Sequence, residues 1–587
     1  MQLSTLALSI TNVIGKQYSP ASWFTQGEQG AWYDPSDLTT LFQNYAGTTP
    51  VTAVEQPVGL MLDKSQGLAL GPELITNGNF NDGTTDWSIN STYGSMSNVT
   101  GELQVTTTAV SDYYGGYQSF PTVSGRMYKI SVTCRLGTAS AGRLSFGSAA
   151  NVGNWDYINF LNTSNTTITH YVYAFGNTAY YSLTCNTGTA YFDNVTIKEL
   201  AGNHAFQYTA GNRPTLSARV NLLTYSEQFD NAAWSKNNAS VSANATADPL
   251  GGNTADKIVE NATTNAHQIY YPSITVSASS YTASVYAKAA ERTAFAIDFY
   301  GLFTGGLDKY AVFDLSTGVV SSTAAGVSAT ITSAGGGWYK CTATYTGIST
   351  ALSYYIAVMN GLSWASNYNY TGNGTSGVYI WGADIRPTNI GAALPSYQRV
   401  TTSTDYDTVG FPLYLKTNGT SSAMATYSIN FTSTAAMTVV TGVRKLSDAA
   451  LGMLAELSVS AGTSAGTFYV LPQHTDTKAY YSSAGTSGVN VSSGANAAPY
   501  SSVITGISAI STPLASIRVN GTQVGTSSAS QGTGTFGTYP LYLFARAGTS
   551  LWFNGQFYGA IICGASKTTA EIQQAESYEN QKAGGLY

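Results

Sequence analysis

Two short stretches of the chain concentrate aromatic residues beside glycine and asparagine. The first is DYYGGYQ (112–118) and the second is WASNYNYTGNGTSG (364–377). Aromatic rings stack on the faces of sugar rings, and nearby Asn, Asp and Gln side chains can pair with sugar hydroxyl groups. The pattern therefore predicts weak glycan-binding sites, although half of the aromatic residues in a strand are expected to face the core. The six aromatic residues concerned are Tyr113, Tyr114, Tyr117, Trp364, Tyr368 and Tyr370.

Residues that could carry out catalysis are sparse and scattered. The four histidines lie far apart without an HExxH pattern, and the phosphate-binding sequence GxxxxGK[ST] does not occur. Glycoside hydrolysis needs a pair of carboxylates on one face, whereas the acids of the predicted strands stand alone, as Asp298 does in FAIDFYG. We therefore expect a protein that is not an enzyme, with a site assembled across subunits as the alternative.

Composition favours several β-rich domains. The 587 residues are 43% hydrophobic and only 10% charged, with 60 Gly and 42 Tyr, which suits short strands and tight turns. A net charge of −6 without clusters of Lys and Arg argues against a nucleic-acid partner. Because no run of 18 apolar residues occurs, we expect no membrane insertion, and we interpret the first residues as structured rather than as a secretory signal. The four separated cysteines predict buried thiols, with a Cys134–Cys185 disulfide as the alternative.

Two parts of the chain repeat one another. TVSGRMYKISV (122–132) and TVSASSYTASV (275–285) share Thr-Val-Ser, a Tyr six residues after the Thr, and Ser-Val at equal spacing. Each copy also opens with an apolar pair, Thr, Phe and Trp, in ELITNGNFNDGTTDW (73–87) and NLLTYSEQFDNAAW (221–234). Alternating strands close both copies, so we expect two related β-sandwich domains with Greek-key or jelly-roll connections.

The last part of the chain predicts a third β body followed by a helix. LASIRVNGTQVG (514–525) carries an Asn-Gly pair, which predicts a tight hairpin turn, and FNGQFYG (553–559) repeats that pair. The segment 568–585 predicts a helix, because Thr568 and Glu571 form a capping box and two glycines end it. The expected fold class is therefore all-β, with multiple jelly-roll or β-sandwich domains and one short C-terminal helix.

The two repeated copies resemble the jelly rolls of carbohydrate-binding modules, in the galactose-binding-like group. NGNF with a following Trp opens the first copy and FDNVTI (192–197) closes it, whereas the second copy closes with WGADI (381–385) and lacks the opening NG. Modules of this kind often hold a structural ion at the sheet edge, between the first and last strands. The resemblance thus implies a structural calcium ion with oxygen ligands. The residues that match this idea are Asp82, Asp86 and Asp193.

The third body resembles the concanavalin-A-like, laminin-G-like sandwich of phage and prophage fibre proteins, through its RVNG hairpin, FNGxxYG strand and closing helix. In such proteins a segment like residues 32–65 (WYDPS to LMLDKS) leads directly into a segment like residues 202–216 (GNHAFQYTAGNRPTL). Here the two are separated, which implies one sandwich interrupted by insertions, with a string of separate domains as the alternative. The implied parts are a virion-docking or oligomerisation segment 1–30, a discontinuous sandwich of 31–65, 202–220 and 411–587, and inserted jelly rolls 66–201 and 221–400.

The resemblance and the missing catalytic motifs lead to one functional hypothesis. We expect a bacteriophage virion fibre or host-adhesion subunit that contacts other virion proteins and binds host surface polysaccharide. Many copies would convert weak sites into avidity, and we expect a homo-oligomer such as a trimer, although no heptad pattern indicates one. Two alternatives stay open, namely a purely structural head, neck or tail protein of the virion and a polysaccharide-active enzyme.

Overall fold

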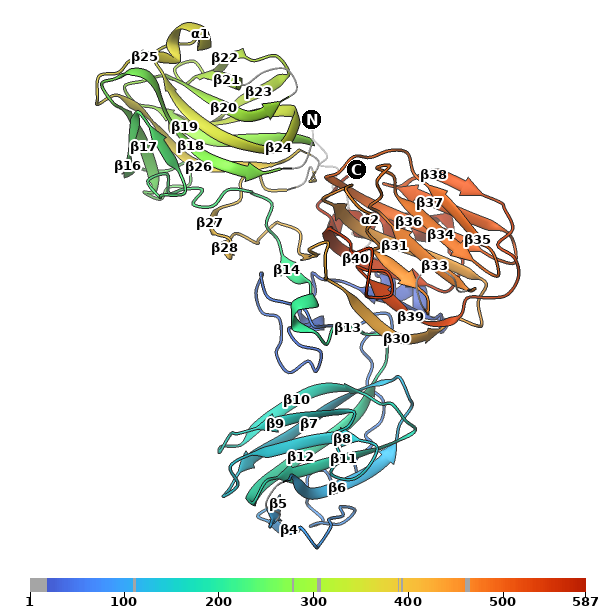
Figure 1. The fold of residues 1–587 in the computed structure, drawn as a ribbon. Coiled ribbons are helices and arrows are strands. Elements are labelled where there is room, and N and C mark those ends of the chain that lie inside the picture. Colours follow the sequence, from blue (N-terminus) through green and yellow to red (C-terminus); the bar gives the residue numbers. More distant parts are fainter. Residues whose placement is uncertain are drawn as a thin grey trace, which may run out of the picture.

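The computed structural model describes residues 18–587 except 109–111, 277–278, 304–307, 389, 392–393 and 460–464. Strands dominate the described residues, which confirms the all-β prediction. Figure 1 shows three bodies, in which two jelly rolls extend in different directions from a sandwich that includes the C-terminal helix. The helices of the described part are η1 (Pro20–Phe24), η2 (Leu38–Thr40), η3 (Ala210–Asn212), α1 (Trp364–Asn367) and α2 (Thr569–Lys582).

Two antiparallel sheets form the sandwich, and each combines strands from distant parts of the sequence. The first sheet has the order β14 (Thr215–Ser217), β29 (Tyr414–Lys416), β40 (Gly555–Cys563), β31 (Ala436–Lys445), β36 (Tyr500–Ala509), β37 (Leu514–Val519) and β38 (Thr522–Ser527), with β1 (Gly30–Tyr33) also paired to β40. The second has the order β2 (Leu41–Phe42), β3 (Leu60–Met61), β13 (Ala205–Phe206), β30 (Met424–Asn430), β39 (Thr538–Leu543), β32 (Ala455–Leu457), β33 (Thr467–Leu471), β34 (Tyr480–Ala484) and β35 (Gly488–Ser492).

A single hydrophobic core joins the three stretches of chain that build the sandwich. Tyr33, Leu216 and Phe557 come from the three stretches, and all of them belong to one cluster of buried side chains. Burial of this apolar surface is the main favourable term that holds distant segments together. Whether each body folds on its own, with the domain boundaries given above, stays a prediction.

The first jelly roll packs a five-stranded sheet on a four-stranded one. The five-stranded order is β10 (Thr166–Tyr173), β7 (Met127–Leu136), β12 (Gly188–Leu200), β5 (Glu102–Thr107) and β4 (Gly94–Val99). The four-stranded order is β6 (Tyr114–Pro121), β11 (Thr178–Cys185), β8 (Gly142–Gly147) and β9 (Asp156–Phe160). Buried and less buried residues alternate along β7, as expected for a strand with one face on the core.

The second jelly roll has two layers that share one long strand. The main order is β16 (Ala239–Thr246), β17 (Ala255–Glu260), β26 (Gly377–Pro387), β19 (Ser279–Ala289), β24 (Trp338–Met359), β20 (Ala294–Phe303), β21 (Asp308–Asp314) and β22 (Val319–Thr323). Pairing beside this order adds β15 (Ser235–Asn237), β18 (Thr264–Thr275), β23 (Val327–Gly335) and β25 (Asn369–Thr371), and a separate hairpin is formed by β27 (Val400–Thr402) and β28 (Asp405–Tyr406). The first half of β24 pairs with β19 and β23, and its second half pairs with β18 and β20. The change of layer falls at Gly347, whose φ of +107° suits only glycine.

The repeated openings form the same local structure in both jelly rolls. Phe80 packs on Trp87 with ring centroids 5.3 Å apart, and Phe229 packs on Trp234 at 4.9 Å. Each indole N–H donates to a backbone carbonyl of the preceding segment, at 3.2 and 3.0 Å. Both tryptophans are buried, so they serve the two cores.

The chain enters and leaves the first jelly roll at adjacent points of the sandwich. β3 and β13 pair antiparallel, and just beyond them Asp63, Asn203 and His204 form a hydrogen-bonded polar group that we call the first neck. Asp63 and His204 are buried, and Asn203 is half-buried. The backbone N–H of Asn203 donates to Asp63 at 2.7 Å, and the backbone N–H of Asp63 donates to Nδ1 of His204 at 2.9 Å. The segments LDKS and GNHAFQ therefore meet in space across the inserted residues.

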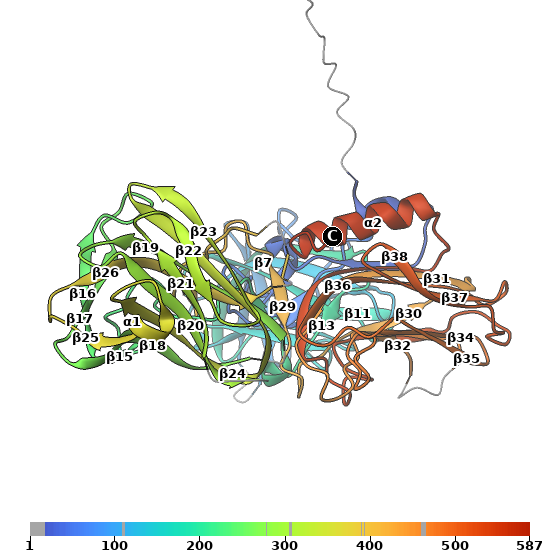
Figure 2. The ribbon, with the colours of Figure 1, turned by 90° about the horizontal axis from the view of Figure 1, so that it is seen from above.

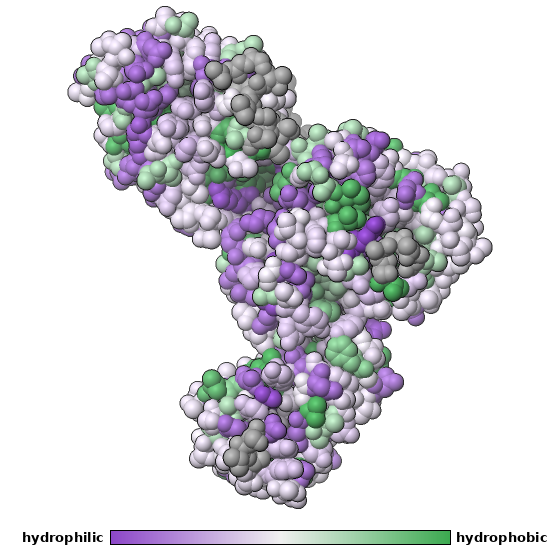
Figure 3. Space-filling model, viewed as in Figure 1, coloured by the Kyte–Doolittle hydropathy of each residue, from purple (hydrophilic) through white to green (hydrophobic). Residues whose placement is uncertain are grey.

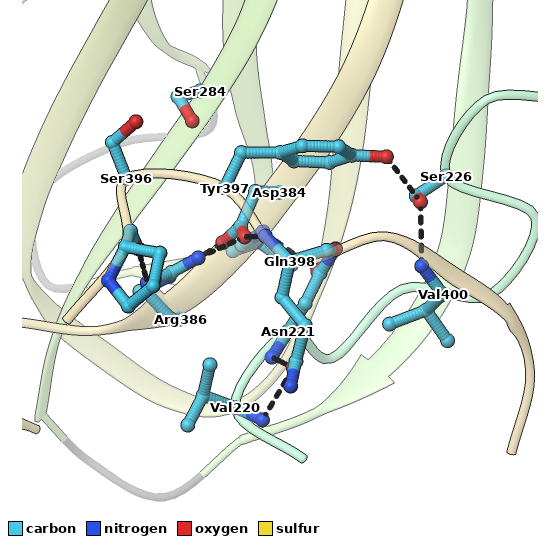
Figure 4. Close-up of polar contacts among 12 residues, drawn as sticks. Val220, Asn221, Ser226, Ser284, Asp384, Arg386, Ser396, Tyr397, Gln398 and Val400 are labelled. Atoms are coloured by element: carbon cyan, nitrogen blue, oxygen red, sulfur yellow. Dashed lines mark hydrogen bonds and ion pairs between the residues drawn. The ribbon is translucent and has the colours of Figure 1, made fainter. Parts of the chain in front are cut away.

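A second buried polar group holds the ends of the second jelly roll, as Figure 4 shows. The side-chain oxygen of Gln398 accepts from the backbone N–H groups of Val220 and Asn221 at 2.7 and 3.0 Å. The Asn221 amide donates in turn to the backbone oxygens of Gln398 and Ala383, and the Gln398 N–H donates to Asp384. We call Asn221, Asp384 and Gln398 the second neck. All three side chains are buried and hydrogen-bonded, which is the condition for burying polar groups without loss of stability.

Helix α2 covers the outer face of the first sandwich sheet, where Figure 2 shows it lying above β31 and β36. Its N-terminus has the predicted capping box between Thr568 and Glu571, and Gly584 and Gly585 follow it with positive φ. Of the predicted docking segment, residues 1–17 lie outside the described residues. The described remainder packs against the sandwich through Trp23, which is fully buried and whose carbonyl accepts from Lys567 at 2.8 Å.

The two Asn-Gly pairs of the third body have different structures. Asn520 and Gly521 join β37 to β38 with positive φ at both residues, which is the predicted hairpin turn. The second prediction was wrong, because Gly555 begins β40 instead of lying in a turn. Glycine is needed there because a Cβ would lie 2.3 Å from the Arg444 carbonyl of neighbouring β31.

Several surface and core properties complete the fold. The four cysteines are all buried and free, so the alternative disulfide is not formed. In the view of Figure 3 hydrophobic residues occur in small separate groups among polar ones. No helix of the described residues is long and apolar enough to cross a bilayer.

Candidate functional site

The two jelly rolls carry tyrosines at equivalent positions on one sheet face. In the first jelly roll strand pairing across β6, β11, β8 and β9 sets four residues side by side, and pairing across β18, β24, β20 and β21 does so in the second. The first row is Tyr117, Ser182, Ser145 and Tyr157, and the second row is Tyr270, Tyr355, Asp298 and Tyr310. Tyr117 and Tyr270 each stand five residues before the Thr of the repeated Thr-Val-Ser, so sequence and register give the same alignment.

The first of these faces holds an arginine that contacts two tyrosine rings. The guanidinium carbon of Arg143 lies 3.9 Å from the ring centroid of Tyr113 and 4.5 Å from that of Tyr157. Its Nε–H donates to the side-chain oxygen of Asn159 at 2.9 Å. Tyr157 is 48% exposed, so a ligand can reach the cluster from solvent. With Tyr117 and Tyr180, whose rings lie 6.2 Å apart, these residues form what we call the tyrosine–arginine face.

Strand alternation explains why these side chains point outward. Leu144, Phe146, Tyr181 and Leu183 fill the core, so the residues between them on β8 and β11 lie on the opposite side of the sheet. The loop between β8 and β9 returns over the centre of that side. Its Asn151 backbone N–H donates to the Ser182 hydroxyl at 2.8 Å, which keeps the middle of the row buried and leaves the tyrosines around it.

The six aromatic residues predicted from the sequence are not all on these faces. Tyr113 and Tyr117 lie on the tyrosine–arginine face, whereas Tyr114 points to the other side of β6 and stacks on Tyr93 with centroids 4.3 Å apart. The alternation of a strand separates neighbours in sequence, so DYYGGYQ cannot place its three tyrosines together. Tyr114 is therefore left out of the proposed site.

The second face carries a stack of three aromatic rings. Tyr310 and Trp364 are nearly parallel with centroids 4.2 Å apart, and Trp364 stacks on Tyr368 at 4.0 Å. The Tyr368 hydroxyl donates to the side chain of Gln268 at 2.7 Å, so the segment that includes α1 spans the sheet from β21 to β18. The predicted residues Trp364 and Tyr368 thus lie beside the equivalent tyrosine row. Tyr370 does not, because it is buried and its hydroxyl donates to Glu260 at 2.5 Å.

A buried carboxyl group lies in the middle of the second row. Burial and the neighbouring carboxylate of Asp308 raise the pKa of Asp298 to about 8, although the Lys309 N–H donates to it at 3.0 Å. The group is therefore mostly protonated at neutral pH and can donate a hydrogen bond. We call Tyr270, Asp298, Tyr310, Tyr355, Trp364 and Tyr368 the tyrosine–aspartate face.

The residues matched to a calcium site do not converge. Among the described residues, no three or more His, Cys, Asp or Glu side chains gather in a way that could hold a metal ion. Asp82 and Asp86 are exposed, while Asp193 accepts hydrogen bonds from Asn194 and has a pKa raised by partial burial. Structural calcium remains a prediction.

Sequence reasoning missed the residues that complete the two faces. Arg143, Tyr157 and Asn159 lie on β8 and β9, which the sequence analysis did not single out. The alternation in GRLSFG and DYINF indicates outward positions, but only the strand order brings them to Tyr113. The same holds for Tyr270, Tyr310 and Tyr355 in the second jelly roll.

Comparisons with known proteins find similarity to solved structures over parts of the chain. A scan against protein-family models finds no match, and a search of curated proteins finds none. Among solved structures, the chain is similar to the CBM40 module of the Ruminococcus gnavus IT-sialidase bound to alpha2,3 sialyllactose (14% identity, 24% of this chain, 83% of that chain, TM-score 0.21). It is also similar to a CBM22 tandem from Paenibacillus barcinonensis (13%, 55% and 99%, TM-score 0.24) and to a CBM4 structure (18%, 21% and 99%, TM-score 0.19). Since these identities and TM-scores are low, the two faces are interpreted from their own geometry.

Proposed function

We propose that this chain is a non-enzymatic glycan-binding protein whose two jelly rolls hold saccharides on the tyrosine–arginine and tyrosine–aspartate faces. The observation that carries the proposal is the repetition of tyrosines at equivalent register positions in two diverged copies. Packing alone does not account for Tyr157, since nearly half of its surface is exposed. Some of the similar structures are carbohydrate-binding modules, which is consistent with the proposal. The proposal itself rests on the geometry of the two faces.

The chemistry of the first face suits a sugar ring. Tyr157 offers an aromatic surface for the C–H face of a saccharide, and Asn159 and Arg143 lie close enough to pair with its hydroxyl groups. The rings are held by the sheet and by the arginine that contacts them, so little side-chain freedom is lost on binding. Two faces on one chain also allow two contacts with one polysaccharide.

The cellular setting we propose is the bacteriophage virion. The sandwich resembles the fibre class described above, and a fibre subunit would present its jelly rolls to host surface polysaccharide. In that setting the partners are other virion proteins and further copies of the same chain, arranged as a homo-oligomer.

Binding to candidate host cells tests this proposal. Labelled protein should bind saturably, soluble surface polysaccharide should compete, and Tyr157→Ala should weaken half-maximal binding at least about fivefold through the lost stacking. Tyr587→Ala is the matched control, because it removes a tyrosine of similar exposure (53%) from the sandwich. Equal binding by wild type and Tyr157→Ala would refute the assigned site.

A purely structural virion protein is the second candidate. It predicts folded, oligomeric protein that binds no cell and no polysaccharide at micromolar concentration. A polysaccharide-active enzyme would instead release reducing ends from the bound polymer, which a standard reducing-sugar assay measures.

A further inference from the structure

The arginine of the tyrosine–arginine face differs from the other arginines of the described residues. Those at 126, 135, 292, 386, 399, 518 and 546 pair with carboxylates. Arg213 and Arg219 donate to backbone carbonyls, and Arg444 donates to a serine hydroxyl. Arg143 has no carboxylate partner among the described residues, and its contacts are Asn159 and two aromatic rings.

These contacts hold the guanidinium beside two aromatic rings. Both ring centroids lie within 4.5 Å of the guanidinium carbon and Asn159 accepts from the Nε–H, whereas no hydrogen bond within the described residues engages the terminal nitrogens. A guanidinium edge with two parallel N–H groups matches the two oxygens of a carboxylate. Stacking on aromatic rings holds such a group in place without neutralising its charge.

We propose that the tyrosine–arginine face selects saccharides that carry a carboxylate, with Arg143 as the group that binds the acid. This rests on the glycan-binding function proposed above and names its ligand class. The sugar ring would stack beside Tyr157 while its carboxylate receives two hydrogen bonds from the terminal nitrogens of Arg143. The chain carries a net charge of −6, so most of its surface is expected to repel an anionic saccharide. Arg143, which has no carboxylate partner among the described residues, would attract such a saccharide locally.

The second jelly roll provides an internal contrast. In the row next to the tyrosines, Thr184, Arg143 and Asn159 lie side by side in the first jelly roll, whereas Ala357, Ala296 and Val312 occupy the equivalent positions in the second. Those apolar residues support Tyr310, Trp364 and Tyr368. The second face thus offers aromatic surface and the protonated Asp298 without a cation, and it is expected to take neutral saccharides.

The test uses the full chain and a panel of acidic oligosaccharides, each paired with its carboxyl-reduced form, beginning with trigalacturonic acid and galactotriose. Calorimetric titration should give a Kd for the best acidic ligand that rises at least about tenfold on carboxyl reduction or in Arg143→Met. Arg143→Met should not weaken the reduced ligand further, since methionine keeps the packing against the rings. Binding of the acidic ligand should also weaken with salt, and this dependence should be smaller in the variant.

Arg126→Met is the matched control, because Arg126 belongs to the same jelly roll but approaches only Glu199, at 3.9 Å. Its Kd should equal that of wild type. The inference is overturned if the reduced ligand binds as well as the acid, or if Arg143→Met weakens both forms equally, because the arginine would then only support the tyrosines. Neutral binding that Tyr157→Ala abolishes would leave the proposed function standing without the acid preference. Failure of every panel member to bind would overturn both.

Discussion

Helix α2 carries a buried glutamate, Glu579, whose replacement is expected to stabilise the protein at neutral pH. Glu579 is fully buried, and neither carboxyl oxygen has a hydrogen-bond partner of good geometry among the described residues. Gly442 and Gly559 lie beneath it, where a Cβ would come within 3.1 and 2.7 Å of the carboxylate. Burial and the charge of Asp34 raise the pKa of Glu579 well above its usual value, and the nearby Lys582 and Gly442 amide only partly oppose this.

The sign of the pH dependence follows from proton linkage. The unfolded chain releases the Glu579 proton above the usual pKa of 4.5, whereas the folded chain retains it. The stability that this group contributes is complete below pH 4.5 and is lost as pH rises towards the folded pKa. A buried acceptor without a hydrogen-bond partner costs about 1–3 kcal/mol. Glu579→Gln keeps the shape of the side chain without its ionisation, so it should raise the free energy of unfolding by about that amount at pH 7, with little gain at pH 4.5.

Scanning calorimetry of the full chain at pH 4.5, 6 and 7.5 measures the effect. The transition of the sandwich should move up by roughly 3–10 °C at the higher pH values in Glu579→Gln. Glu576, one turn earlier on the same helix, gives the opposite control, because it is buried but paired with Arg518 at 2.7 Å. Glu576→Gln should lower the transition, since it leaves the arginine without its carboxylate. A Glu579→Gln variant that is destabilised, or that gains equally at all three pH values, would refute the reasoning.

Four further outcomes are expected from other parts of the chain. Gln398→Ala should destabilise the second jelly roll by about 2–4 kcal/mol through the buried partners it leaves unpaired, and faster proteolysis of that part should accompany a lower melting temperature. Burial lowers the pKa of His204 to about 4, so the contribution of this group to the free energy of unfolding is present above pH 6.5 and is lost as pH falls. Near pH 5 this loss should be about 2 kcal/mol. His204→Gln should remove this part of the pH dependence in a series of melting temperatures. If the first jelly roll holds the implied calcium ion, EDTA should lower its melting temperature and added calcium should restore it, whereas unchanged melting in EDTA would refute the ion. A polypeptide of residues 66–201 should unfold cooperatively by circular dichroism if this jelly roll is a domain, and a non-cooperative melt would contradict that assignment.

Local signals in the sequence were sufficient for several elements. The capping box at Thr568 and the glycines after α2 specify the helix ends, and Asn520-Gly521 specifies one hairpin. The repeated Phe and Trp of the two openings indicated buried residues, and Trp87 and Trp234 are buried. These features depend on a few neighbouring residues, which is why pattern reasoning finds them.

The candidate site depends on long-range pairing, which the sequence does not display. Tyr113 and Arg143 meet because β6 and β8 both pair with β11, and no local pattern fixes that order. Tyr114 and Tyr370 were wrongly predicted to belong to a glycan-binding cluster. A group of aromatic residues close in sequence does not show which side of a strand each ring takes. The tight turn predicted at Asn554-Gly555 was wrong for a related reason. Glycine is needed at position 555 because the Arg444 carbonyl of neighbouring β31 approaches too closely for a Cβ.

The two necks also determine how tension would pass through the protein. β3 and β13 leave the sandwich side by side, so a force applied to the first jelly roll is shared by two strands. A domain joined by one linker would place the same force on a single covalent path. The hydrogen bonds among Asp63, Asn203 and His204 join the two segments just beyond these strands. The first jelly roll is therefore attached through two chain segments that are cross-linked to each other, and pulling it away would load both strands at once.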